Sequence, residues 1–179
     1  MPFVKGRTNT RNSAPHTSRP LYTAEERVRR DESVWTVVQG VLAPIQFLAF
    51  LISLGLVFRY LSTGNGLDVA LWSVAIKTMM LYAIMITGCI WEKVVFGRYL
   101  FAPAFYWEDL FSMLVLGLHT AYLAALVTDV LSARHLIYLA LAAYLTYVVN
   151  AGQFIWKLRT ARLDHARQQA VLSPTGLTA

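Results

Sequence analysis

The sequence contains one cysteine and few charged side chains, and both shortages narrow the class of protein. With Cys89 as its one cysteine, the 179-residue chain cannot form an internal disulfide, and it has no Cys/His spacing typical of a metal site. Charged residues make up 15% of the chain, whereas soluble domains have about 25%. Hydrophobic residues reach 56%, more than a soluble fold of this length can bury. The composition therefore favours a membrane protein.

Four apolar stretches cover about residues 34–61, 67–91, 110–131 and 135–156. Each is long enough to cross a bilayer as a helix, which takes roughly 20 residues. A few residues join the last two stretches, so these should form a tight helical hairpin. The sequence predicts an all-α polytopic membrane protein in which residues 23–160 form a transmembrane domain of four helices.

The two ends of the chain are polar and basic. Residues 1–22 have four basic and no acidic residues and lack the apolar run of a signal peptide, so we expect a disordered basic tail. Thr23 and Glu26 match a capping box, which predicts a short helix before the first span. Residues 161–179 should form a second tail. Lys and Arg are concentrated before residue 34, after residue 156 and, more sparsely, in the 92–109 connection, so both termini and that connection are expected in the cytoplasm.

Polar side chains interrupt the apolar spans, where a charged group costs roughly 2.5–3.5 kcal/mol. Lys77 and His119 lie near the middle of the second and third spans, and the helical repeat puts Glu108 on the same face as His119. Further polar residues share faces of the first, third and fourth spans: Gln39, Gln46, Ser53, Ser112, Tyr122, Asn150, Gln153 and Lys157. Because lipid offers no hydrogen-bond partners, these faces should meet in a polar cleft open toward the cytoplasm.

Simpler interpretations exist for the same residues. The Gln and Asn side chains also suit hydrogen bonding between helices, and His119 and Lys77 also suit packing or pairing in the core. Glu92 and Asp109 equally fit solvated helix ends. The aromatic residues of the 101–107 segment equally fit an interfacial belt.

The 91–109 segment, WEKVVFGRYLFAPAFYWED, mixes charges with aromatic rings. Rings such as Tyr106 and Trp107 suit a flat ligand, and Lys93 and Arg98 suit a carboxylate held at the water edge. The segment therefore fits a planar, amphipathic substrate that partitions into lipid. No nucleic-acid partner is expected.

Four stretches carry a resemblance to a known family: QGVLAPIQF (39–47), GCIWEKVVFGRYLFAPAFYWED (88–109), SMLVLGLHTAYLAAL (112–126) and YVVNAGQF (147–154). They resemble the 3-vinyl bacteriochlorophyllide hydratase (chlorophyllide a 3-vinyl hydratase) family of bacteriochlorophyll biosynthesis, over roughly residues 22–160. The resemblance implies addition of water to the C3 vinyl group of a chlorophyllide or bacteriochlorophyllide, giving a 1-hydroxyethyl group. It also implies a multi-pass protein of the bacterial inner membrane. This is either the cytoplasmic membrane or the intracytoplasmic photosynthetic membrane. The expected partners are the pigment, the lipid bilayer and other pigment-biosynthesis enzymes.

This chemistry needs an acid for the terminal vinyl carbon, a base for the water and groups that hold the ring. Glu108 is our first candidate for the acid and Glu92 the second, because a carboxylic acid in an apolar pocket keeps its proton near neutral pH. His119 is expected either to act as the base or to ligate the pigment's magnesium. The candidate substrate-binding residues are Lys77, Lys93, Arg98, Tyr106, Trp107, Asn150 and Gln153. Neither a cofactor nor a protein-bound metal is expected.

Two other functions compete with a hydratase. The first is a non-catalytic membrane protein that binds or assembles pigment, with His119 as a magnesium ligand. The second is a small transporter, which is disfavoured because the spans lack the Gly/Pro interruptions of broken helices, apart from Pro44.

Overall fold

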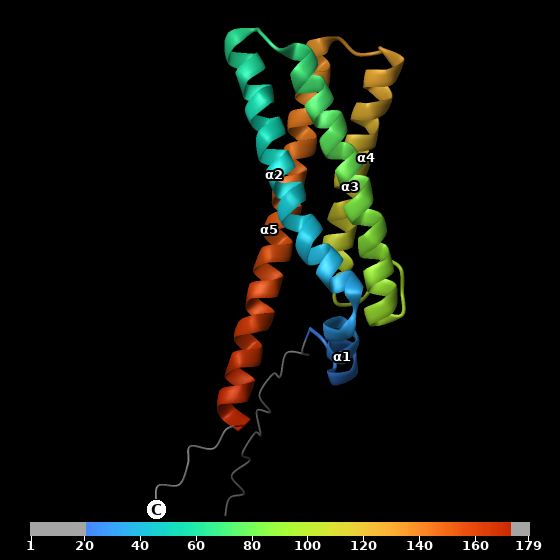
Figure 1. Cartoon of the computed structure of the whole chain (residues 1–179), viewed down its shortest axis with the longest axis vertical. Coiled ribbons are helices and arrows are strands. Elements are labelled where there is room, and N and C mark those ends of the chain that lie inside the picture. Colours follow the sequence, from blue (N-terminus) through green and yellow to red (C-terminus); the bar gives the residue numbers. More distant parts are fainter. Residues whose placement is uncertain (1–20, 173–179) are drawn as a thin grey trace, which may run out of the picture.

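The computed structural model describes residues 21–172, which form one short and four long helices (Figure 1). The short helix α1 (Ala24–Glu32) precedes α2 (Val34–Thr63), α3 (Leu67–Phe96), α4 (Tyr106–Thr128) and α5 (Ala133–Leu172). Each long helix has the length and apolar composition needed to cross a membrane. The prediction of an all-α protein with four candidate spans is confirmed. Most of the two predicted tails, residues 1–20 and 173–179, lies outside the described residues.

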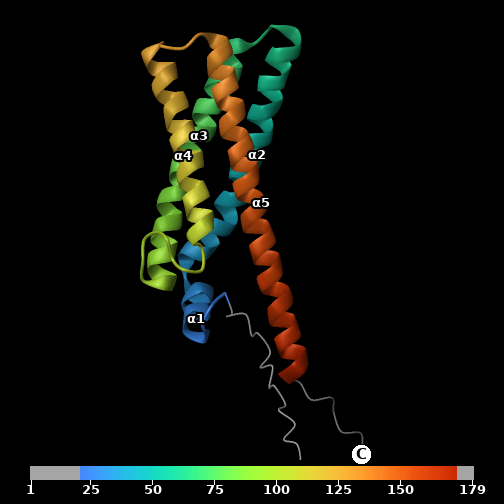
Figure 2. The same ribbon diagram turned by 180° about the vertical axis from the view of Figure 1, so that it is seen from behind.

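The long helices form two antiparallel hairpins, α2 with α3 and α4 with α5. The tight connections at 64–66 and 129–132 lie at one end of the bundle, while α1, the 97–105 connection and the end of α5 lie at the other (Figures 1 and 2). Gly64 and Gly66 adopt left-handed backbone conformations in the first tight connection, with φ of 72° and 84°. A residue without a Cβ is favoured there. Both ends of the described chain therefore lie at the same end of the bundle.

Two features at the ends of the helical region were not predicted from the sequence. Helix α5 runs to Leu172, through residues assigned to the second tail, because no Gly or Pro follows Gly152 within it. Before α1, Tyr22 is buried and stacks on Phe96, with ring centroids 5.7 Å apart. Burial raises the pKa of Tyr22 above its ordinary value, although the Arg30 guanidinium 4.6 Å from its ring opposes the shift. The capping box that starts α1 is confirmed.

Side chains from all four long helices form a packed core in the half of the bundle that holds the tight connections. Its fully buried members include Val57, Val74, Val115, Tyr122 and Ile137. Polar contacts cross this core: Tyr144 donates to the Ser53 hydroxyl at 2.6 Å, and Ser53 lies 2.6 Å from the Ser73 hydroxyl. These contacts fix α2, α3 and α5 to one another.

The helices α2 and α5 cross in this packed half and then separate toward the end that holds α1 (Figures 1 and 2). Contacts of Phe50 with Tyr144 and Tyr147, at centroid distances of 5.2 and 5.0 Å, mark the crossing. Pro44 lies inside α2 just before it, where its ring removes a backbone donor and favours a bend. The separation of α2 and α5 makes room for the site described next.

Candidate functional site

A cavity of about 1160 Å³ lies between α2, α3 and α5, with the start of α4 on one side and α1 at one end. Ligand pockets in proteins usually measure about 300–1,000 Å³, so this one suits a large ligand. Its α2 and α5 walls are mostly apolar and include Ala43, Pro44, Phe47, Ala151, Phe154, Ile155 and Leu158. Phe47 and Ile155 are 46% and 67% exposed although they line the cavity. The cavity is therefore open sideways, between α2 and α5.

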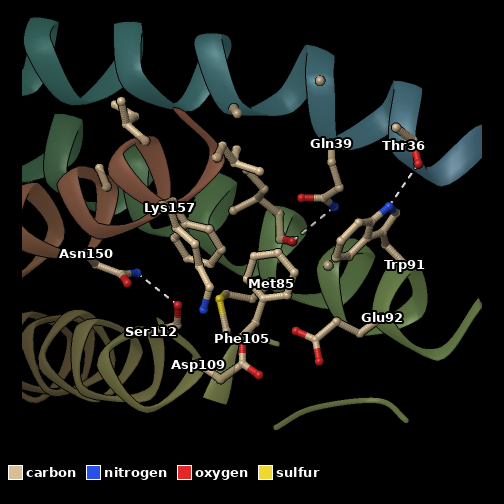
Figure 3. A pocket seen from close by; sticks show the side chains of 18 of the residues that line it. Thr36, Gln39, Met85, Trp91, Glu92, Phe105, Asp109, Ser112, Asn150 and Lys157 are labelled. Atoms are coloured by element: carbon tan, nitrogen blue, oxygen red, sulfur yellow. Dashed lines mark hydrogen bonds between the residues drawn. The ribbon is translucent and has the colours of Figure 1, made fainter. Parts of the chain in front are cut away.

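Two carboxyl groups face one another in the cavity wall, Glu92 from the end of α3 and Asp109 from the start of α4 (Figure 3). They lie within hydrogen-bonding range. Both side chains are largely buried, at 6% and 4% exposure. Two carboxylates this close repel, and a proton shared between them removes the repulsion. We call Glu92 and Asp109 the carboxyl pair.

The 97–105 connection holds the carboxyl pair through its backbone. Asp109 Oδ2 accepts from the Phe101 amide at 2.7 Å, and Glu92 Oε2 accepts from the Ala102 amide at 3.4 Å. Phe101 has a φ of 58°, a conformation that non-glycine residues rarely adopt. In this conformation the Phe101 amide points at Asp109 and makes the short contact with it.

Amide and hydroxyl groups follow the carboxyl pair along the cavity. Asn150 on α5 donates through Nδ2 to the Ser112 hydroxyl of α4 at 2.9 Å, and both residues line the cavity (Figure 3). Asn150 Oδ1 is buried and has no hydrogen-bond partner among the described residues. On the opposite side, Gln39 donates to the Thr87 hydroxyl at 2.7 Å.

Basic side chains surround the part of the cavity next to α1. Lys157 Nζ lies 2.6 Å from Glu108 Oε2 and 4.9 Å from the centre of the Phe105 ring. Arg27 and Arg30 of α1 and Arg162 of α5 also line the cavity. The cavity thus combines apolar walls, a carboxyl pair and a basic end.

The predicted catalytic histidine lies outside this cavity. His119 Nε2 is 2.7 Å from Lys77 Nζ, and His119 Nδ1 is 2.8 Å from the Val115 carbonyl. Both His119 and Lys77 are fully buried, and neither lines the cavity. Tyr147, which does line it, lies over Lys77 with its ring centre 4.1 Å from Nζ. Both ring nitrogens of His119 therefore have partners within the core.

Most other predicted site residues also lie away from the cavity. Glu108 contacts Lys157 rather than the cavity, and Lys93 Nζ donates to the Gly97 carbonyl at 3.0 Å. Gln153 has a buried Oε1 with no partner among the described residues but does not line the cavity. Arg98, Tyr106 and Trp107 are exposed. Of the predicted residues, the structure brings Glu92 and Asn150 into the cavity wall.

Sequence reasoning did not assign a site role to Asp109 or to the arginines of the cavity. Asp109 stands one helical turn before Ser112, so a helical plot that extended the polar face to the start of α4 would have included it. Arg27 and Arg162 lie outside the apolar spans, and no pattern near them shows that α1 folds against the cavity. Among the described residues, no three His, Cys, Asp or Glu side chains form a metal-binding group.

The fold defines a helical protein with four helices suited to cross a membrane, and its cavity combines apolar walls with a basic end. Residues 22–160 match the sequence profile of the family described as 2-vinyl bacteriochlorophyllide hydratase (BCHF), and the chain belongs to this family. The vinyl-bearing position is numbered 2 in this description and 3 in the name used above.

Two curated relatives carry the same description. The 2-vinyl bacteriochlorophyllide hydratase of Cereibacter sphaeroides is 63% identical over 155 residues, which cover 87% of this chain and 95% of the relative. That of Rhodobacter capsulatus is 61% identical over 160 residues, covering 89% and 93%. No solved structure matches the chain.

The Glu108–Lys157 contact gives a test of the site's architecture. Lys157→Met should lower the free energy of unfolding by about 1–3 kcal/mol, because it leaves the largely buried Glu108 carboxylate without its partner. Adding Glu108→Gln should recover part of this loss, with a coupling of about 0.5–3 kcal/mol between the two sites. Unfolding in detergent micelles measures both quantities. Lys93→Met is the matched control, and strictly additive effects of the Glu108 and Lys157 changes would contradict the pairing.

Proposed function

We propose that this protein is a hydratase of bacteriochlorophyll biosynthesis that adds water to the vinyl group of a chlorophyllide or bacteriochlorophyllide. The product carries a 1-hydroxyethyl group in place of the vinyl group. The observation that carries the proposal is the carboxyl pair in the wall of a large, mostly apolar cavity, in a chain that belongs to this family. The apolar walls suit a macrocycle, and the pair suits proton transfer.

The carboxyl pair can both give and take the protons that hydration requires. Its proton passes to the terminal vinyl carbon, which leaves a cation on the inner carbon that the conjugated ring delocalises. Water then forms a C–O bond at the inner carbon, and the carboxylate accepts the proton that the water releases. One proton leaves the pair and one returns, so the pair ends as it began and the net change is addition of H₂O.

The backbone contacts assign different roles to the two members of the pair. Asp109 receives an amide hydrogen bond of 2.7 Å, while the one to Glu92 is 3.4 Å. The shorter contact stabilises a negative charge more. The charge therefore rests on Asp109, which acts as the base, and Glu92 holds the proton and acts as the acid.

This assignment differs from the first candidates taken from the sequence. Glu108 contacts Lys157 at 2.6 Å and does not line the cavity, so it is not placed to reach the ligand. His119 has partners on both ring nitrogens and lies behind the cavity wall. For the same reason, the alternative of a non-catalytic pigment-binding protein with His119 as magnesium ligand loses its main support.

Aromatic residues near the carboxyl pair are placed to hold the ring. Phe105 and Phe154 stack with centroids 5.9 Å apart, and Trp91 contacts Phe105 edge-on at 5.8 Å. All three line the cavity. Aromatic faces also stabilise a cation, such as the one formed when the vinyl group is protonated. These rings take the role that the sequence suggested for Tyr106 and Trp107.

Removing either carboxyl group should abolish most of the turnover. Membranes that contain the protein, supplied with a vinyl-bearing bacteriochlorophyllide, should form a hydroxyethyl product whose red absorption band shifts to shorter wavelength as conjugation shortens. Glu92→Gln and Asp109→Asn should each slow this about a hundredfold or more, since general acid–base groups contribute ~10²–10⁴-fold.

Asp68→Asn, at the opposite end of α3, is the matched control and should keep the wild-type rate. A greater loss in Glu108→Gln than in either variant of the carboxyl pair would move the acid to Glu108. Pigment binding by the wild type without product formation would favour the non-catalytic alternative.

We also propose that the cavity end faces the cytoplasm, in the inner or intracytoplasmic photosynthetic membrane, with both tails on that side. The support is the charge distribution. In the described chain, the cavity end of the bundle carries Arg27, Arg29, Arg30, Lys93, Arg98, Lys157, Arg159 and Arg162, against Arg59 and Arg134 at the other end. The predicted contact with other pigment-biosynthesis enzymes, which would meet this face, stays a prediction.

Reporter fusions test this orientation. Alkaline phosphatase, which is active outside the cytoplasm, should be inactive when fused after Ala179 and active when inserted after Asn65. Green fluorescent protein fused after Ala179 should fluoresce. The opposite pattern would place the cavity end outside the cytoplasm.

A further inference from the structure

We propose that Arg27 and Arg162 form a carboxylate-binding subsite at the end of the cavity, which selects pigments with a free acid over their esters. The proposal rests on the proposed function, because it concerns the ligand of the same cavity. Arg27 comes from α1 and Arg162 from α5, and both line the cavity. Residues from the two ends of the described chain thus line the same cavity.

The three arginines of α1 are used in different ways. Arg29 donates to the Val95 carbonyl at 2.9 Å and so attaches α1 to the end of α3. Arg30 pairs with Asp31 at 2.7 Å and covers the Tyr22 ring. Arg27 has no ion-pair or hydrogen-bond partner among the described residues, yet it lines the cavity. Of the two arginines of α1 that line the cavity, Arg27 is the one without an ion-pair partner among the described residues.

The same contrast holds on α5. Lys157 is neutralised by Glu108 at 2.6 Å. Arg162 has no such partner among the side chains that the structure describes, and it too lines the cavity. Arg159, one turn earlier, does not line the cavity. Each guanidinium group offers a planar fork of donors, which suits a carboxylate, and the two come from helices on different sides of the cavity.

The position of the subsite fits an amphipathic pigment. Arg162 follows Lys157 by five residues, which is about 7.5 Å along an α-helix. Lys157 lies at the level of the carboxyl pair, since its partner Glu108 adjoins Asp109. A carboxylate held by Arg27 and Arg162 stays at the membrane surface while the macrocycle lies deeper, against the apolar walls. The vinyl group, on a different ring from the acid side chain, can then reach the carboxyl pair.

Comparison of a free acid with its methyl ester tests the subsite, because the ester keeps the ring but loses the charge. Purified protein in neutral detergent should bind and hydrate the free acid with a lower KM than the ester. Arg27→Gln and Arg162→Gln should each raise the KM for the acid about tenfold or more, as loss of a charged hydrogen bond does, and leave kcat and the KM for the ester unchanged. Arg159→Gln should match the wild type for both.

Each contrary result overturns the proposal in a distinct way. Equal KM increases for acid and ester would mean that the arginines hold the fold rather than a carboxylate. An effect of Arg159→Gln equal to that of Arg162→Gln would mean general electrostatic attraction. If the acid–ester difference seen in neutral detergent is lost in vesicles with anionic lipid, the arginines bind lipid phosphate instead.

Failure of the proposed function gives a different result from failure of the subsite. If the wild type forms no hydroxyethyl product, the function fails, and binding measured by pigment fluorescence still reports whether acid and ester differ. If Glu92→Gln loses turnover while the arginine variants treat acid and ester as the wild type does, the function stands and the subsite fails.

Discussion

Lipid cannot supply hydrogen bonds, and this constraint accounts for the polar contacts between the long helices. Lys77 and His119 meet in the middle of the bundle, where neither could face lipid. The Tyr122 hydroxyl donates to the Leu71 carbonyl at 2.9 Å, and Tyr144 reaches Ser53. Each contact joins two helices that apolar packing alone would hold less specifically. Many polar residues of the spans thus contact one another, and several of those that lie beyond the packed half line the cavity.

The cavity arises where this packing stops. The helices α2 and α5 are held together down to Phe50 and Tyr147 and separate beyond them. Helix α1, attached to α3 through Arg29 and to the start of α2 through a hydrogen bond of 2.6 Å from the Thr36 hydroxyl to the Arg30 carbonyl, closes the end. Chemistry-bearing groups collect at this end because it is near the interface, where charged side chains and water are tolerated.

The sequence was sufficient for the helices but not for their contacts. Hydropathy located four spans, and the Thr23–Glu26 pattern located α1, because both signals are local. The helical repeat correctly put Glu108, Ser112 and His119 on one face, and all three are buried. It could not tell which neighbour each would meet. Lys77 contacts His119 and Lys157 contacts Glu108, and these pairings depend on which helices pack side by side.

The same limit explains the residues found only from the structure. Asp109 fitted a solvated helix end as well as a catalyst, because its partner Glu92 lies 17 positions earlier in the sequence, across the 97–105 connection. The contribution of Phe101 and Ala102 is made by backbone amides, which leave no trace in residue type. Arg27 and Arg162 lie almost at opposite ends of the described chain, and nothing in the sequence relates them.

Because the cavity opens between α2 and α5, the ligand can enter it from the lipid rather than from water. Phe47 and Ile155 face both the cavity and the surroundings of the bundle, so a planar molecule dissolved in the acyl chains can approach the site edge-on. Its supply then depends on partitioning and on two-dimensional diffusion rather than on solubility in water. A pigment that gains a hydroxyl group and leaves by the same route stays in the membrane, within reach of whatever protein acts on it next.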